Sequence, residues 1–185
     1  MRIPYALAEP TDPADKAIYD RIKARRNPRP LIPLDLALLH NPSIADGFNS
    51  LLGSIRTQST LSLAAMEVAV CYVAVLNQAP YEWTAHAPLA LKAGVTREVL
   101  EAVLNGNVQD AGVLSEEEID VLEFTRQSTK EIEVSDELMA KLKSRYTDQQ
   151  VMELTITVGA YNMVSRFLVA LDVTESNGKE MVMPE

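Results

Sequence analysis

Cysteine is nearly absent from the 185-residue sequence, and Cys71 alone cannot form a disulfide within the chain. Nothing in this cysteine usage indicates an oxidising compartment, so we expect a cytoplasmic protein. The sequence also lacks a Gly-rich phosphate loop, a Gly-x-Ser-x-Gly motif and a Cys-x-x-Cys motif. The common cofactor-binding motifs are therefore missing, and we expect no cofactor.

Positive charge and long apolar runs are also in short supply. The chain has 17 Lys and Arg residues against 26 Asp and Glu residues, a net charge of -9, which disfavours a nucleic-acid partner. The longest apolar run lies within residues 61–76 and is interrupted by Glu67. It has too few apolar residues to cross a bilayer, so we interpret it as a buried core helix and expect no membrane partner.

Helix signals run through the whole chain. Capping boxes at Ser115–Glu118 and Thr147–Gln150 each predict a helix start, and Gly94 and Gly106 suit the left-handed residue that ends a helix. The β-prone segment 155–158 lies inside a helical pattern, so no strand is predicted. The sequence therefore predicts one all-α domain of about eight helices, among them helices ending near Arg26 and His40 and helices over about 63–78, 96–105 and 147–171.

Three segments divide the chain. Residues 1–40 hold N-terminal helices and a Pro-rich linker, residues 41–173 form the main helical domain, and residues 174–185 are a tail. We expect this tail to be either poorly ordered or used in an oligomer contact. Within the main domain, Met66–Val70 and Met152–Ile156 match in pattern. This echo suggests a duplicated helical hairpin whose copies pack face to face, although chance similarity is an alternative.

Glu67 needs an explanation, because an ionised carboxylate is costly to bury among apolar neighbours such as Met66 and Val68. It could be a proton donor or acceptor whose pKa is raised by these surroundings. Alternatively, it lies on an exposed stripe of its helix or forms a structural ion pair with Arg56 or Arg166. The residues alone favour the structural alternative, since perturbed carboxylates are also common in structural networks.

Glu82 and His86 lie four residues apart, a spacing that brings two side chains onto one face of a helix. They meet if Pro80 opens that helix. A carboxylate one turn away can orient an imidazole for proton transfer, whereas the alternative is a surface pair without function. Pro88 weakens the prediction, because in a continued helix its ring would clash with the carbonyl of Thr84.

A metal site would require Glu67, Glu82 and His86 to converge, and one cysteine with two histidines argues against structural zinc. We therefore predict no metal. Aromatic and amide side chains could line a substrate pocket, with an arginine that could hold a carboxylate or phenolate. Simple packing is the alternative for the large aromatics. The candidate substrate-binding residues are Tyr81, Trp83, Tyr161, Asn162 and Arg166.

The pattern of these residues resembles the carboxymuconolactone decarboxylase family, which includes the AhpD-like alkylhydroperoxidases. The resemblance spans about residues 41–173. It implies an AhpD-like helical bundle that assembles into homo-oligomers, often trimers or hexamers, and it adds Asn77 to the substrate-binding candidates. The matching residues are Glu67, Asn77, Tyr81-Glu82-Trp83-x-x-His86, Ala93-Gly94-Val95, Glu101, Glu153-Leu154 and Tyr161-Asn162-x-x-x-Arg166.

Both cysteines of the family's peroxidase branch are missing from this chain. The two cysteine positions hold Ala79 and Glu82, while Glu67 and His86 remain in place. The resemblance therefore argues against thiol peroxidase activity and implies a lyase of the decarboxylase branch. Such an enzyme would act without a cofactor on a small cyclic, lactone or aromatic acid, with Glu67, Glu82 and His86 as catalytic residues. A metal-dependent enzyme at the same residues and a catalytically silent small-molecule-binding protein are the alternatives.

Overall fold

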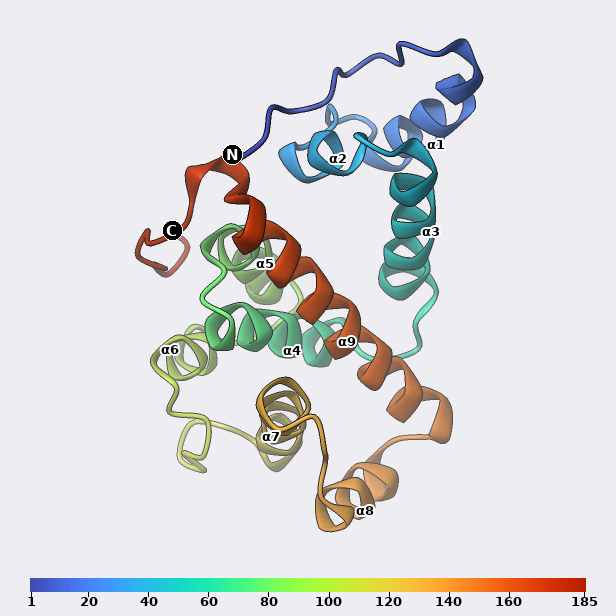
Figure 1. The fold of residues 1–185 in the computed structure, drawn as a ribbon. Coiled ribbons are helices and arrows are strands. Elements are labelled where there is room, and N and C mark those ends of the chain that lie inside the picture. The colour runs from blue at the N-terminus through green and yellow to red at the C-terminus, as the bar shows by residue number, and fades with distance from the viewer. The chain divides into compact units, whose positions relative to one another are not determined.

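The computed structural model describes residues 1–185 and contains nine α-helices, two short 3-10 helices and no strand (Figure 1). The predicted all-α fold is therefore confirmed. The chain forms two compact units. Unit 1 consists of Met1–Gln58 with Leu171–Glu175, and unit 2 consists of Ser59–Ala170 with Ser176–Glu185.

Unit 1 contains a buried ion pair between Arg26 and Asp35, with N···O distances of 2.7 and 2.8 Å. Asp35 also accepts a hydrogen bond from the amide of Ile32 at 3.0 Å, which caps the helix that begins at Pro33. The predicted helices ending near Arg26 and before His40 are both present. The elements of unit 1 are 3-10 helix Pro13–Asp15, α1 (Lys16–Arg26), α2 (Pro33–Leu38), α3 (Pro42–Gln58) and 3-10 helix Val173–Glu175.

Unit 2 is built around helix α4, whose residues 65–74 are all buried. Helix α4 packs against α5, α6 and α7, so every face of it is covered by protein. This explains why its sequence is apolar on all sides rather than along one stripe. The helices of unit 2 are α4 (Leu63–Leu76), α5 (Pro80–Lys92), α6 (Arg97–Asn105), α7 (Glu116–Lys130), α8 (Asp136–Arg145) and α9 (Asp148–Leu171, with Leu171 in unit 1).

The predicted helix ends rest on local hydrogen bonds. Ser115 and Glu118 form the expected capping box, with Glu118 accepting from the Ser115 amide at 2.8 Å. Gly94 and Gly106 have φ values of 99° and 74°, as their positions after α5 and α6 require. Helix α5 begins at Pro80 and continues through Pro88. Because Pro88 has no N–H, the Thr84 carbonyl loses its helical donor; Thr84 is exposed, so water can take that place.

Two expectations about the fold are wrong. Helix α9 is followed by the 3-10 helix Val173–Glu175 and the tail rather than by a partner helix, so the chain contains no second helical hairpin. The tail is not loose, because it is hydrogen-bonded to unit 2. Trp83 Nε1 donates to the carbonyl of Val182 at 2.7 Å, and Arg97 donates to that of Pro184 at 2.9 Å.

Helix α9 is, by length and composition, apolar enough to cross a membrane. One of its faces is buried and includes Leu154, Val158 and Val164. The same face carries Glu153 and Ser165, two buried polar residues that are hydrogen-bonded to other segments of unit 2. We therefore interpret α9 as a core helix of unit 2 with one buried face.

Candidate active site

A carboxylate–imidazole pair joins α4 to α5. Glu67 Oε2 lies 2.7 Å from His86 Nδ1. The Glu67 side chain is only 3% exposed, whereas that of His86 is 13% exposed. An ionised carboxylate can only accept, so the proton of this bond resides on Nδ1, and Nε2 is the ring nitrogen that can exchange a proton with a bound molecule.

The ring of His86 is also held by an aromatic contact from α9. Its centroid lies 5.0 Å from that of Tyr161, and the two ring planes meet at 85°. Such edge-to-face contacts favour one ring orientation. Tyr161 is buried, so the contact fixes the imidazole rather than exposing the phenol ring. Three helices thus position one histidine, a degree of preorganisation typical of a catalytic group.

Glu82 lies on α5 one turn before His86 but has a different partner. Its Oε2 lies 2.8 Å from the Ser165 hydroxyl, which lies 2.9 Å from the carbonyl of Tyr161. The expectation that Glu82 meets His86 is therefore wrong for the hydrogen-bonding geometry, and Glu67 takes that place. The reason is packing: the first turn of α5 faces α9, whereas the imidazole one turn later reaches α4.

Burial raises the pKa of Glu82 well above its usual range, and the Ser165 hydroxyl only partly offsets this. The side chain is 1% exposed, and its Oε1 has no hydrogen-bond partner. A hydroxyl has one proton to donate. With Glu82 protonated, its O–H donates to Ser165 and Ser165 donates to the Tyr161 carbonyl, so every donor in this chain is satisfied. Glu82 thus forms an uncharged link between α5 and α9.

Replacing Glu82 by methionine is expected to make the protein more stable at pH 8 than the wild type. The raised pKa means that the wild-type link is intact below the carboxyl's unfolded pKa of 4.5 and is lost as the pH rises through the folded-state pKa. Methionine has a similar length and no carboxyl to desolvate, so its advantage should grow with pH. Urea unfolding at pH 4 and pH 8, with exposed Glu133→Met as the control, measures this; an equal effect at both pH values contradicts the proposed link.

The substrate-binding candidates form a polar cluster next to the end of α4. Asn77 Nδ2 donates to Asn162 Oδ1 at 2.9 Å, and the same oxygen accepts from Arg166 at 2.7 Å. Asn162 in turn donates to Thr129 on α7 at 2.9 Å. Asn77 also lines an open groove of about 430 Å³ with Pro80 and the tail. The sequence thus grouped Asn77, Asn162 and Arg166 correctly, although none of these hydrogen bonds reaches His86.

The two aromatic candidates on α5 lie in different surroundings. Trp83 is 1% exposed and donates to the tail, so it packs within unit 2. Tyr81 is half-buried at the first turn of the helix. The packing alternative therefore describes Trp83.

Cys71 lies on α4 one turn after Glu67 and is fully buried. Burial raises the pKa of its thiol well above the usual range, and the nearby carboxyls of Glu67 and Glu82 add to the effect. A thiol in these surroundings is protonated and inert at neutral pH. Ala79 and Glu82 stand where the resemblance places a cysteine pair. These residues give no support to thiol peroxidase chemistry.

The acidic and histidine side chains do not gather into a metal site. No group of three or more His, Cys, Asp or Glu side chains in the chain is arranged to hold a metal ion. Glu82 bonds to Ser165 while Glu67 bonds to His86, so the three residues considered as ligands do not converge.

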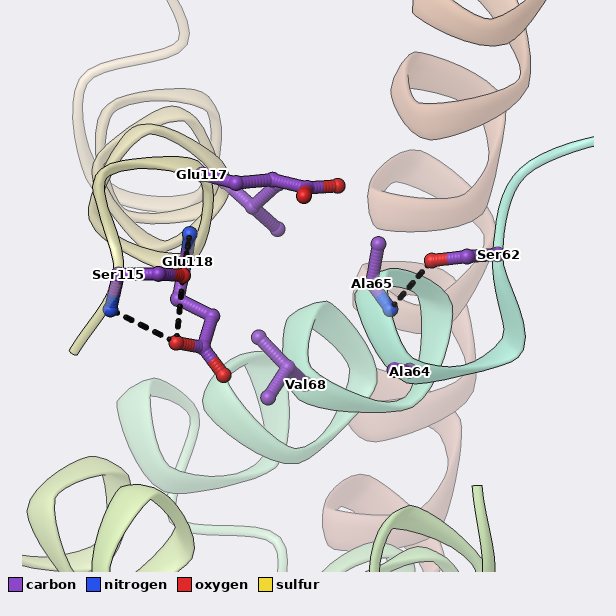
Figure 2. Close-up of a pocket in the computed structure, with 8 residues that line it drawn as sticks. Ser62, Ala64, Ala65, Val68, Ser115, Glu117 and Glu118 are labelled. Carbon is purple, nitrogen blue, oxygen red and sulfur yellow. Dashed lines mark hydrogen bonds between the residues drawn. The ribbon is translucent and has the colours of Figure 1, made fainter. Parts of the chain in front are cut away.

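A second pocket lies between the starts of α4 and α7 (Figure 2). It has a volume of about 120 Å³, and its polar groups already have partners. Ser62 caps α4, Glu118 caps α7, and Glu117 accepts from Tyr146 Oη at 2.6 Å. None of the candidate site residues lines this pocket, so we do not connect it with the Glu67–His86 pair.

Sequence reasoning missed Ser165 and Thr129, which fix Glu82 and Asn162. A serine or threonine within a helix carries no signal of its own, because its partner lies on another helix. Their spacing could have helped: Ser165 lies four residues after Tyr161 and so returns to the same face of α9.

The fold and the carboxylate–imidazole pair together define an AhpD-like helical protein. Residues 42–126, which include both Glu67 and His86, match the sequence model of the Carboxymuconolactone decarboxylase family. The family resemblance is thus confirmed, and this part of the chain is a carboxymuconolactone decarboxylase family region. It is shorter than the span of 41–173 expected from the residues. No curated protein matches the chain.

Two solved structures share the fold. An uncharacterized peroxidase-related protein from Silicibacter sp. TM1040 has a TM-score of 0.72 and 20% identity, with 95% of each chain covered. A protein of unknown function from Agrobacterium tumefaciens, described as a candidate antioxidant defence protein AhpD, has a TM-score of 0.66 and 16% identity. That match covers 77% of this chain and 95% of the other. At these identities the likeness concerns the fold alone.

Proposed function

We propose that the protein is a cofactor-independent lyase of the decarboxylase or isomerase type that acts on a small cyclic, lactone or aromatic acid. The observation that carries this proposal is the 2.7 Å contact between the buried Glu67 carboxylate and His86 Nδ1. Such a pair can pass a proton to or from a carbon acid without a metal or an organic cofactor. The family match over residues 42–126 supports acid/base chemistry on this kind of substrate.

His86 is the proton-exchanging group in this proposal, and Glu67 is its partner. Loss of carbon dioxide from a β-keto acid or its lactone leaves an enolate, which needs a proton at carbon. The imidazolium delivers that proton from Nε2, and Glu67 stabilises the positive ring through Nδ1 while the proton is held. Glu82 is a positioning residue, because it acts on His86 through Ser165 and Tyr161. Arg166, with Asn77 and Asn162, is proposed to bind the substrate's carboxylate.

The cellular setting is part of the proposal. We propose a cytoplasmic enzyme, since its one cysteine is a buried thiol that forms no disulfide. We also propose a homo-oligomer, in line with the family resemblance. Nucleic acid is not a proposed partner, because the net charge is -9.

The experiment is an assay of purified protein against a panel of small lactones, β-keto acids and aromatic acids, with carbon dioxide release and ring isomerisation as readouts. We expect turnover of at least one lactone or keto acid, unchanged after dialysis against a chelator. Activity lost on chelation and restored by one metal per chain would favour the metal-dependent alternative. Binding without turnover across the panel would favour the silent member.

A further inference from the structure

The outer face of α9 is apolar and exposed. Met152, Ile156 and Met163 are 56%, 41% and 44% exposed, and Gly159 between them is exposed as well. Together these four residues define the α9 seam. The buried face of the same helix already forms the core of unit 2, so α9 is apolar on two sides. A helix that is apolar on both sides is normally covered on both sides.

The spacing of the α9 seam is that of a helix–helix contact. Its residues follow at intervals of four, three and four, which are the a and d positions of a heptad. Over residues 152–163 the seam is about 17 Å long at 1.5 Å per residue. Scattered exposed apolar residues need no partner, but a heptad seam presents one continuous strip to a second helix.

The α9 seam is complementary to itself when two copies run antiparallel. With the twofold axis between residues 157 and 158, Met152 faces Met163 of the second copy, and Ile156 faces Gly159 of the second copy. A Cβ added at Gly159 would meet nothing within 4 Å, so this position has room for a bulky side chain from outside. A large residue against a small one, in both halves of the contact, is the arrangement in which helices pack closely.

The charges at the two ends of the α9 seam fit the same pairing. Asp148 is exposed in the first turn of α9, and Arg166 is exposed in the last third of the helix. The Arg166 guanidinium donates to Asn162 rather than to a carboxylate. The antiparallel register places Asp148 of one copy beside Arg166 of the other, twice in the dimer. A parallel register would instead place like charges together.

We infer that α9 is a self-association surface through which two copies of the chain pack antiparallel along the α9 seam. The inference rests on the exposure, spacing and charge of α9 and does not depend on the proposed catalytic activity. One helix pair is a small interface by the standards of stable complexes, so association should depend on concentration in the micromolar range or above.

Charge reversal tests the register. We expect the wild type to dimerise with concentration in sedimentation velocity, and Arg166→Glu to weaken dimerisation at least about tenfold by placing a second carboxylate beside Asp148. The double variant Asp148→Lys with Arg166→Glu should restore dimerisation to within about threefold, because opposite charges face each other again. Failure of the double variant to restore it, with helix content unchanged by circular dichroism, overturns the antiparallel pairing.

A second pair of variants tests the surface itself. Met163→Glu should weaken dimerisation at least about tenfold, because it buries a carboxylate in the α9 seam. The matched control is Val113→Glu, which changes an apolar residue of 40% exposure elsewhere in unit 2 and should have no effect. A wild type that stays monomeric, or association that Met163→Glu leaves unchanged, overturns the inference. Flotation of the wild type with phosphatidylglycerol vesicles, lost in Met163→Glu, would assign the surface to lipid and also overturn it.

Discussion

Replacing His86 by alanine is expected to lower turnover by roughly two to four orders of magnitude on any substrate found in the panel assay. Alanine removes the only group of the Glu67–His86 pair that can carry a proton to carbon. Substrate binding should change much less, because the polar cluster around Asn162 lies on other hydrogen bonds. The measurement is kcat and KM of both proteins at saturating substrate, and the loss should appear in kcat.

Three further variants separate chemistry from folding. Glu67→Gln keeps an acceptor for Nδ1 but removes the charge that stabilises the imidazolium, so kcat should fall by about ten- to a hundredfold. Glu82→Met should stay within about tenfold of the wild type, because Glu82 bonds to Ser165 and not to His86. His40→Ala changes the chain's other histidine, which bonds to the Pro4 carbonyl in unit 1, and should have no effect. Full activity in both His86→Ala and Glu67→Gln would refute the proposed pair.

Replacing Glu153 by glutamine is expected to destabilise the protein by about 2 kcal/mol at pH 7, a fall in Tm of roughly 4–8 °C. Glu153 Oε2 accepts hydrogen bonds from Ser59, Thr60 and the amide of Leu61 at 2.8–3.1 Å, and Oε1 accepts from Gln149. The carboxylate thereby ties the start of α9 to the segment that leads into α4. Glutamine puts an NH₂ group among donors and removes the charge.

The effect of Glu153→Gln should vanish in acid. Burial acts to raise the pKa of Glu153, but the hydrogen bonds from Gln149, Thr60 and Ser59 outweigh it and lower the pKa to about 2. A lowered pKa contributes stability above the unfolded value of 4.5, and this contribution is lost as the pH falls from 4.5 towards 2. Urea unfolding at pH 7 and pH 3, with Glu133→Gln as the exposed control, measures the difference. An effect that does not shrink at pH 3 would mean that the charge of Glu153 is not responsible.

Glu67 and Glu153 show what a local pattern can and cannot predict. Both follow a methionine at the head of an apolar helix, and both are buried, as that pattern suggested. Their partners are unrelated, since one holds an imidazole and the other holds a turn. The echo therefore predicted burial of an acid but gave no information about its role, because the role depends on which segment packs against it.

The sequence by itself determined where helices begin and end, that the fold is all-α, and that no cysteine pair is available for thiol chemistry. These properties depend on caps, glycines and residue types within a few positions of one another. Only the tertiary structure decided that His86 pairs with Glu67, 19 residues away, and that Glu82 pairs with Ser165, 83 residues away. Helical spacing brings Glu82 and His86 onto neighbouring turns, but their partners are set by the helices that α5 packs against, and that packing is a property of the whole core.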